Sequence, residues 1–137
     1  MQIFISHDEQ DRDLARILAG QLQQAGFQVW DESREIYPGD NWAKIIGEAL
    51  ESSEVLVALV TRPQPASDSL ARDVLFALTQ GPNYRGRVVP VFVGQHKFVA
   101  SPELPWVLLK LDPVYIATPA EGFDKVIERL QSFHVPA

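Results

Sequence analysis

Val55-Leu56-Val57-Ala58-Leu59-Val60 is the strongest indication of the fold in this sequence, because it is apolar at every position and has the length of one strand. A strand with one face in solvent alternates apolar and polar residues, whereas a strand buried on both faces is apolar throughout. Continuous runs of this kind are typical of central strands in parallel sheets. We therefore predict that residues 55–60 form the middle strand of a parallel sheet.

Shorter apolar segments on both sides of this run also have strand character, namely residues 1–5, 27–30, 88–93 and 114–116. Pro90 removes one backbone donor from the fourth strand, which predicts a bend or a position near an edge. Apolar residues at helical spacing alternate with these strands and predict helices over 11–25, around 45–50, over 67–79 and over 123–130. Gly26 is expected to end the first helix. Prolines interrupt residues 94–112, where only a short helix or an extended piece at 106–111 is expected.

Strands that alternate with helices predict an α/β fold with right-handed crossovers. The number and size of these units favour a flavodoxin-like three-layer fold with a five-stranded parallel sheet in the order 2-1-3-4-5. The length of 137 residues, 46% of them hydrophobic, suits one domain over residues 1–137.

Composition excludes several classes of function. The chain has no cysteine, so disulfides, thiolate metal sites and a cysteine nucleophile are excluded. Its formal charge of −6 argues against direct nucleic-acid binding. His96 and His134 have no acids or cysteines at ligand spacing, so no metal is expected. No secretory signal or membrane-spanning run is present, which predicts a cytoplasmic protein that does not bind membranes.

Ligands of doubly wound sheets bind beyond the carboxyl ends of the strands. In this sequence that rim is expected to gather Ser6, His7, the loop of residues 31–41 and the segment of residues 61–73. His7 is expected to line a pocket there or to bond the backbone at a helix start. No glycine-rich dinucleotide or phosphate-loop motif occurs, which disfavours a Rossmann dehydrogenase. A phosphate-accepting receiver domain is set aside because Val60 is followed by Thr61-Arg62 rather than by an aspartate.

Three stretches together resemble a Toll/interleukin-1 receptor (TIR) domain of bacterial type. They are Ile3-Phe4-Ile5-Ser6-His7 at the start, residues 26–42 with Val29-Trp30-Asp31 and Pro38-Gly39, and residues 67–78. The Pro38-Gly39 loop looks like the BB loop of the family. The resemblance implies either an enzyme that cleaves the nicotinamide–ribose bond of NAD or a non-catalytic adaptor that binds other TIR domains.

In the TIR enzymes, a glutamate on the third helix follows a serine, with a tryptophan between them. Counting six positions from Ser67, as in those enzymes, reaches Asp73, and the position of the tryptophan falls on Ser69. Aspartate keeps the carboxylate but is shorter by one methylene, or about 1.5 Å of carbon–carbon bond. If the match is shifted, Asp68 is the other candidate for the catalytic acid. The non-catalytic alternative is that Asp73 is a solvated acid in the N-terminal half of a helix, where negative charge is favoured.

The resemblance implies Asp73 as the catalytic residue and a substrate site that includes Phe4, Ser6, His7, Tyr37, Trp42, Ser67 and Ser69. Phe4, Tyr37 or Trp42 would supply a stacking surface, although a lone tryptophan such as Trp42 is more often a core residue, and Trp30 and Trp106 are expected to be packing residues. Phosphate groups would be met by serine hydroxyls, by backbone amides, or by cations among Arg34, Arg62 and Arg72. The interaction loop would include Asp31, Arg34, Ile36, Pro38 and Gly39, with Asp31 expected to orient the loop.

Cleavage of this bond passes through an oxocarbenium-like ribose that a nearby carboxylate stabilises, and nicotinamide leaves as a neutral base. NAD is thus expected as substrate, with no cofactor. The family further implies activation by self-assembly into a homo-oligomer or filament, and a role in bacterial immunity, anti-phage defence or signalling. The sequence leaves open whether the product is free ADP-ribose, a cyclic form or a transferred nucleotide. It also leaves open the alternative of a non-catalytic interaction module, which the departures at Asp73 and Ser69 support.

Overall fold

The described strands form one parallel sheet in the order β2-β1-β3-β4-β5, as the sequence predicts. A computed structural model of the chain describes residues 2–31, 39–62, 70, 72–75, 87–94, 109–118 and 122–133, and for Trp42 the backbone alone. The strands are β1 (Gln2–His7), β2 (Gln28–Asp31), β3 (Val55–Val60), β4 (Val88–Val93) and β5 (Val114–Ile116). The apolar run of residues 55–60 is β3, at the centre of the sheet and buried at every position.

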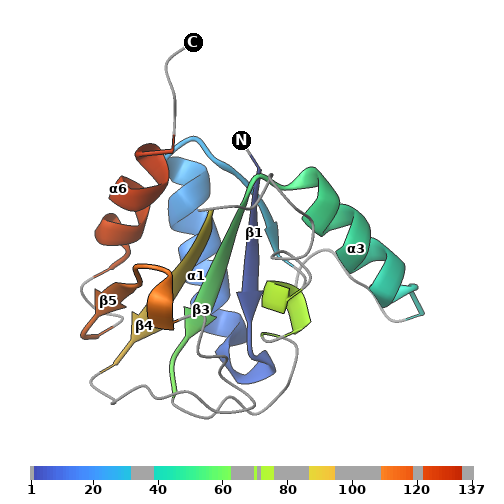
Figure 1. Ribbon diagram of the computed structural model, residues 1–137, viewed down its shortest axis with the longest axis horizontal. Coiled ribbons are helices and arrows are strands. Elements are labelled where there is room, and N and C mark those ends of the chain that lie inside the picture. The colour runs from blue at the N-terminus through green and yellow to red at the C-terminus, as the bar shows by residue number, and fades with distance from the viewer. Residues whose placement is uncertain are drawn as a thin grey trace.

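Helices cover both faces of this sheet, which gives the three layers of the predicted fold (Figure 1). One core lies under α1 (Arg12–Gln24) and α6 (Asp124–Gln131) and contains the odd-numbered residues of β1 and β3. The other lies under α3 (Trp42–Ser52) and helical residues 72–75 and contains the even-numbered apolar residues of the same strands. Successive side chains of a strand point to opposite faces, so each strand serves both cores.

Local sequence signals fix the ends of two helices. Gly26 follows α1 with a φ of 99°, its amide donates to the Gln23 carbonyl, and the Phe27 amide donates to the Leu22 carbonyl. This pair of bonds is a Schellman motif, in which glycine adopts the left-handed conformation without strain. At the start of α3, the Asn41 side chain accepts a bond from the Lys44 amide at 3.4 Å.

Pro90 lies inside β4 without disrupting the sheet. The Leu56 amide of β3 donates to the Arg87 carbonyl, so the backbone polar groups of Arg87 and of the alternate residue Val89 point toward β3. The backbone of Pro90 therefore points to the other side, where β5 lies. Pairing between β4 and β5 begins only at Val91. The donor that proline lacks therefore falls where β4 has no partner on that side, which agrees with the predicted position near an edge.

Some element bounds differ from those predicted. β1 continues through Ser6 and His7, because both residues pair with β3. Asp31 is the last residue of β2 and pairs with Ile5, so its assignment to the following loop was wrong. Of the predicted third helix, Leu70 and residues 72–75 are helical, and of residues 94–112, only Leu109 and Lys110 are helical among those described. Within the described part of the chain, no helix is long and apolar enough to cross a membrane.

Candidate functional site

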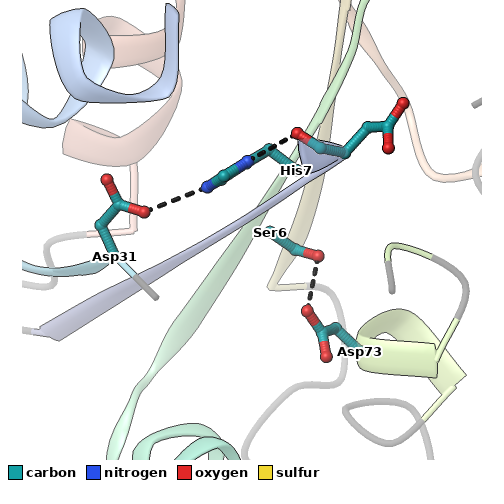
Figure 2. A network of polar contacts seen from close by, with 5 residues as sticks. Ser6, His7, Asp31 and Asp73 are labelled. Carbon is teal, nitrogen blue, oxygen red and sulfur yellow. Dashed lines mark hydrogen bonds and ion pairs between the residues drawn. The ribbon is translucent and has the colours of Figure 1, made fainter. Parts of the chain in front are cut away.

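Asp73 is fully buried at the carboxyl end of β1 and bonded to Ser6. Ser6 lies on the face of β1 that turns toward residues 72–75, and its Oγ donates to Oδ2 of Asp73 at 2.8 Å (Figure 2). The other carboxylate oxygen, Oδ1, accepts from Nε and Nη2 of Arg72 at 3.2 and 3.1 Å. The Arg72 side chain is 39% exposed. Asp73 is therefore not a solvated helix-surface acid, and that alternative was wrong.

Burial raises the pKa of the Asp73 carboxyl above its usual range, since a charged group loses its hydration inside the protein. The Ser6 hydrogen bond and then the positive charge of Arg72 act against this rise. A carboxyl group with a raised pKa at the rim of a doubly wound sheet is a candidate for function. Ser6 and Asp73 are thus two predicted site residues that the fold brings together.

His7 contacts Asp31 on the opposite face of the sheet. Its Nε2 lies 3.1 Å from Oδ1 of Asp31, and its Nδ1 lies 2.8 Å from the main-chain carbonyl oxygen of Asp8. Both side chains are almost fully buried, at 4% and 1% exposure. Figure 2 shows the His7–Asp31 pair and the Ser6–Asp73 pair diverging from neighbouring positions of β1. The rim therefore holds two polar networks rather than the one cluster that the sequence suggested.

Asp11 forms a further buried contact on the His7 side. Its Oδ1 accepts from Oγ1 of Thr61 at 2.7 Å and lies 3.5 Å from Nη2 of Arg62. Burial raises the pKa of the Asp11 carboxyl, and the Thr61 bond and the Arg62 charge act against that rise. Arg62, one of the predicted phosphate-binding cations, is thus engaged by an aspartate.

Sequence reasoning missed Asp8 and Asp11 as buried rim acids. Asp11 belongs to the short 3-10 helix η1 (Glu9–Asp11), which leads from β1 into α1. Their signal was their place in the sequence, directly after a buried strand and before an amphipathic helix. Acids at a helix start are commonly solvated, and for that reason the pattern alone did not identify them.

Phe4 belongs to the core rather than to an open surface. Its ring is fully buried and stacks on Trp30, with ring centroids 4.9 Å apart and planes 15° apart. A ring without exposed area cannot stack on a ligand in this conformation, so its predicted contact with substrate is not what the structure shows. Trp30 is a packing residue, as expected.

The remaining predicted residues are only partly visible. Gly39 is exposed and has a φ of 91°, in the left-handed region that favours glycine. The predicted residues outside the described part of the chain are Arg34, Ile36, Tyr37, Pro38, Ser67, Asp68, Ser69, Trp106 and the side chain of Trp42. Among the described residues, no group of three or more histidine, aspartate or glutamate side chains is placed to hold a metal ion.

A groove of about 550 Å³ lies between β5 and α6, and the predicted site residues do not line it. Its lining consists of Pro113, Val114, Tyr115, Lys125, Glu128, Arg129 and Ser132. The polar networks at the ends of β1 and β2, rather than this groove, are therefore the candidate site.

The parallel sheet of order 2-1-3-4-5, with helices on both faces and acidic residues at its carboxyl rim, defines a flavodoxin-like α/β domain. A model of the TIR domain family matches residues 3–130. The chain therefore belongs to the TIR domain family, as its sequence motifs suggested.

Solved TIR structures share this fold at low sequence identity. The TIR domain of the Toll-related receptor TRR-2 from Hydra magnipapillata has a TM-score of 0.64 at 16% identity, covering 95% of this chain and 94% of that one. A metazoan TIR-STING receptor from C. gigas has a TM-score of 0.71 at 21% identity, covering 98% of this chain but 40% of that one. The TIR domains of the activated Roq1 resistosome have a TM-score of 0.58 at 14% identity, covering 95% of this chain and 76% of that one. No curated protein sequence matches the chain.

Proposed function

We propose that this TIR domain cleaves the nicotinamide–ribose bond of NAD and that Asp73 is its catalytic carboxylate. The observation that carries the proposal is the position of Asp73. It is held by Ser6 at the carboxyl ends of the parallel strands, where α/β sheets bind their ligands. The family resemblance also implies Asp73 as the catalytic acid, and this supports the proposal.

The chemistry requires one negative group beside the ribose. As the bond to nicotinamide breaks, positive charge develops on the sugar, and a fixed carboxylate in a site of low dielectric constant stabilises that charge strongly. Nicotinamide leaves as a neutral base, so a general acid is not needed. In this chain, Ser6 would orient one carboxylate oxygen, which leaves the oxygen now bound by Arg72 to face the sugar.

The complete burial of Asp73 indicates that the site is closed in a single chain. Substrate would reach the carboxylate only after Arg72, whose side chain is 39% exposed, moves away. We infer that association with other TIR domains, as a homo-oligomer or filament, drives this change. Self-assembly would then activate the domain by opening this closed site.

A non-catalytic interaction module is the second candidate, and the same burial favours it. Both oxygens of Asp73 already have partners within the chain, as expected of a carboxylate that stabilises the fold. Aspartate also reaches about 1.5 Å less far than the glutamate of TIR enzymes. In this reading, the domain binds other TIR domains without turnover.

The deciding experiment measures assembly and turnover together. Light scattering reports assembly at high protein concentration with and without a crowding agent, while NAD loss and nicotinamide release are followed in the same samples. Asp73→Asn is the test variant, and Asp13→Asn, which neutralises an exposed acid on α1, is the matched control. Turnover in the control that is absent from Asp73→Asn supports the enzyme. Assembly without turnover supports the interaction module, and turnover that survives in Asp73→Asn assigns the reaction to another acid.

The finer assignments stay predictions. They are the bacterial type of the domain, its role in defence or signalling, a cytoplasmic location, the extent of one domain over residues 1–137, and NAD as substrate without a further cofactor. By their names, the structural neighbours include receptors and a resistosome that recognises a pathogen effector, which is consistent with a role in defence or signalling. Whether the product is free ADP-ribose, a cyclic form or a transferred nucleotide depends on water access to the open site.

A further inference from the structure

Both ring nitrogens of His7 face hydrogen-bond acceptors. Nδ1 lies 2.8 Å from the main-chain carbonyl oxygen of Asp8, and a carbonyl oxygen can only accept. Nδ1 therefore carries a proton. Nε2 lies 3.1 Å from a carboxylate oxygen of Asp31 (Figure 2), and this second contact also needs a proton between the two atoms.

A neutral imidazole has one N–H group, so the pair His7–Asp31 holds one proton more than a neutral ring beside a carboxylate. That proton belongs to the more basic partner. Unperturbed histidine has a pKa of about 6.5 and unperturbed aspartate a pKa of about 3.9, which places the proton on His7. The geometry is that of an imidazolium bound to a carboxylate.

The charges around the ring favour the same state. Among the described residues, acidic groups lie near His7 on several elements, and Arg62 and Arg72 are themselves paired with two of these acids. The set comprises Asp8 after β1, Asp11 of η1, Asp31 of β2, Asp73 of the helical residues 72–75, and Arg62 and Arg72. The positive charge of His7 in turn favours the ionised forms of Asp11 and Asp73.

We propose that His7 is a buried imidazolium at neutral pH that pairs with Asp31 and so joins the carboxyl ends of β1 and β2, and that its deprotonation at alkaline pH removes the positive charge from this contact. Asp31 directly precedes residues 32–38, which belong to the predicted interaction loop. The last residue of β2 is thereby held by a contact whose charge depends on one side chain. The proposal is independent of NAD cleavage, because it concerns only the charge of His7.

An NMR titration of the full chain tests the protonation state. The variant with His96→Gln and His134→Gln leaves His7 as the one histidine, and the nitrogen-15 shifts of its ring distinguish the imidazolium from either neutral tautomer. We expect both ring protons to persist at about pH 7.5, which is one unit above the ordinary imidazole pKa of about 6.5. A ring that loses its proton near the ordinary value, or one already neutral below it, overturns the proposal.

Asp31→Asn identifies the group responsible, with Asp13→Asn on the exposed face of α1 as the control of equal charge change. We expect Asp31→Asn to lower the midpoint of His7 deprotonation by about one pH unit or more, since an opposite charge in direct contact has an effect of this size. Asp13→Asn should leave the midpoint unchanged. Equal midpoints in the two variants contradict the proposal.

Unfolding experiments distinguish a His7–Asp31 contact that depends on pH from simple packing of the His7 ring. A cation held by the fold stabilises the native state at low pH, and this contribution is lost as pH rises through the folded-state midpoint. The difference in unfolding free energy between the wild-type chain and His7→Gln should therefore shrink as pH rises. A difference that is constant with pH indicates packing alone and overturns the proposal. If His7→Gln does not fold, the NMR titration of the chain that keeps His7 still decides whether His7 is protonated.

Discussion

Ser6 and His7 are neighbours on β1, yet they serve different parts of the molecule. Ser6 turns to the face covered by α3 and residues 72–75, where it bonds Asp73. His7 turns to the face covered by α1 and α6, where it binds Asp31. The first contact joins a neutral hydroxyl to a carboxylate, and the second joins two buried groups of opposite charge. Adjacency at a strand end therefore places residues at one rim but not in one pocket.

The largest expected effect comes from breaking the charged contact. His7→Leu should lower the free energy of unfolding by about 3 kcal/mol or more, because it removes the buried cation that His7 places against the buried Asp31 carboxylate. Urea denaturation measures this loss. The double variant His7→Leu with Asp31→Leu should be more stable than His7→Leu alone, since it buries no uncompensated charge. If the double variant is the less stable of the two, the contact does not carry the charge described here.

Ser6→Ala should have a smaller effect on the other face. A hydrogen bond to a buried charged group contributes about 1.5–3 kcal/mol, and its loss leaves Arg72 as the remaining described partner of the Asp73 carboxylate. The variant should also raise the pKa of Asp73 further, since Ser6 now favours the ionised form. Carbon-13 NMR of the Asp73 carboxyl follows that change. An unchanged titration would mean that the bond does not persist in solution.

The pH dependence of stability should distinguish Asp73 from a paired surface acid. Burial raises the pKa of Asp73 in the folded state above 3.8, so the folded chain binds a proton more tightly than the unfolded chain. Asp73 therefore costs stability as pH rises from about 4 through its folded-state pKa. Asp73→Asn lacks this titration, so its stability relative to the wild-type chain should increase over that interval and then level off. A relative stability that falls with rising pH would give the shift the opposite sign.

Arg72→Met should have the smallest effect on stability. The Arg72 side chain is 39% exposed, so solvent screens its ion pair with Asp73 and the loss should be at most about 1 kcal/mol. Thermal and urea unfolding measure it. A loss as large as that of His7→Leu would show that Arg72 is essential to the buried network rather than a displaceable cover.

The sheet and its order could be predicted because they depend on strongly periodic signals. Residues 55–60, 88–93 and 114–116 were placed as β3, β4 and β5 with the observed bounds, since apolar runs and turn residues mark both ends. The last helix has its predicted apolar face, with Phe123, Val126 and Leu130 buried. Its periodicity alone determined which residues face the sheet.

The site was less predictable because its geometry depends on tertiary contacts. Motif spacing selected Asp73, and the position after the first predicted strand selected Ser6, but their hydrogen bond and the complete burial of Asp73 follow from how residues 72–75 pack on β1. The length of β1 was underestimated because Ser6 and His7 are polar residues that the fold buries. The face of the sheet on which each network lies depends on how Ser6 and His7 pair with β3, which composition does not reveal.

The most direct test of the account compares two buried aspartates under the same substitution. Nicotinamide release from NAD is measured under assembling conditions for Asp73→Asn and Asp31→Asn, with folding checked in each sample. We expect Asp73→Asn to lower the rate by about a hundredfold or more, because the charge that develops in the transition state loses its partner. Asp31→Asn should lose stability but keep turnover within several-fold for each molecule that is folded and assembled. Loss of turnover in Asp31→Asn with retention in Asp73→Asn would contradict the account, because it would place the chemistry on the opposite face of the sheet.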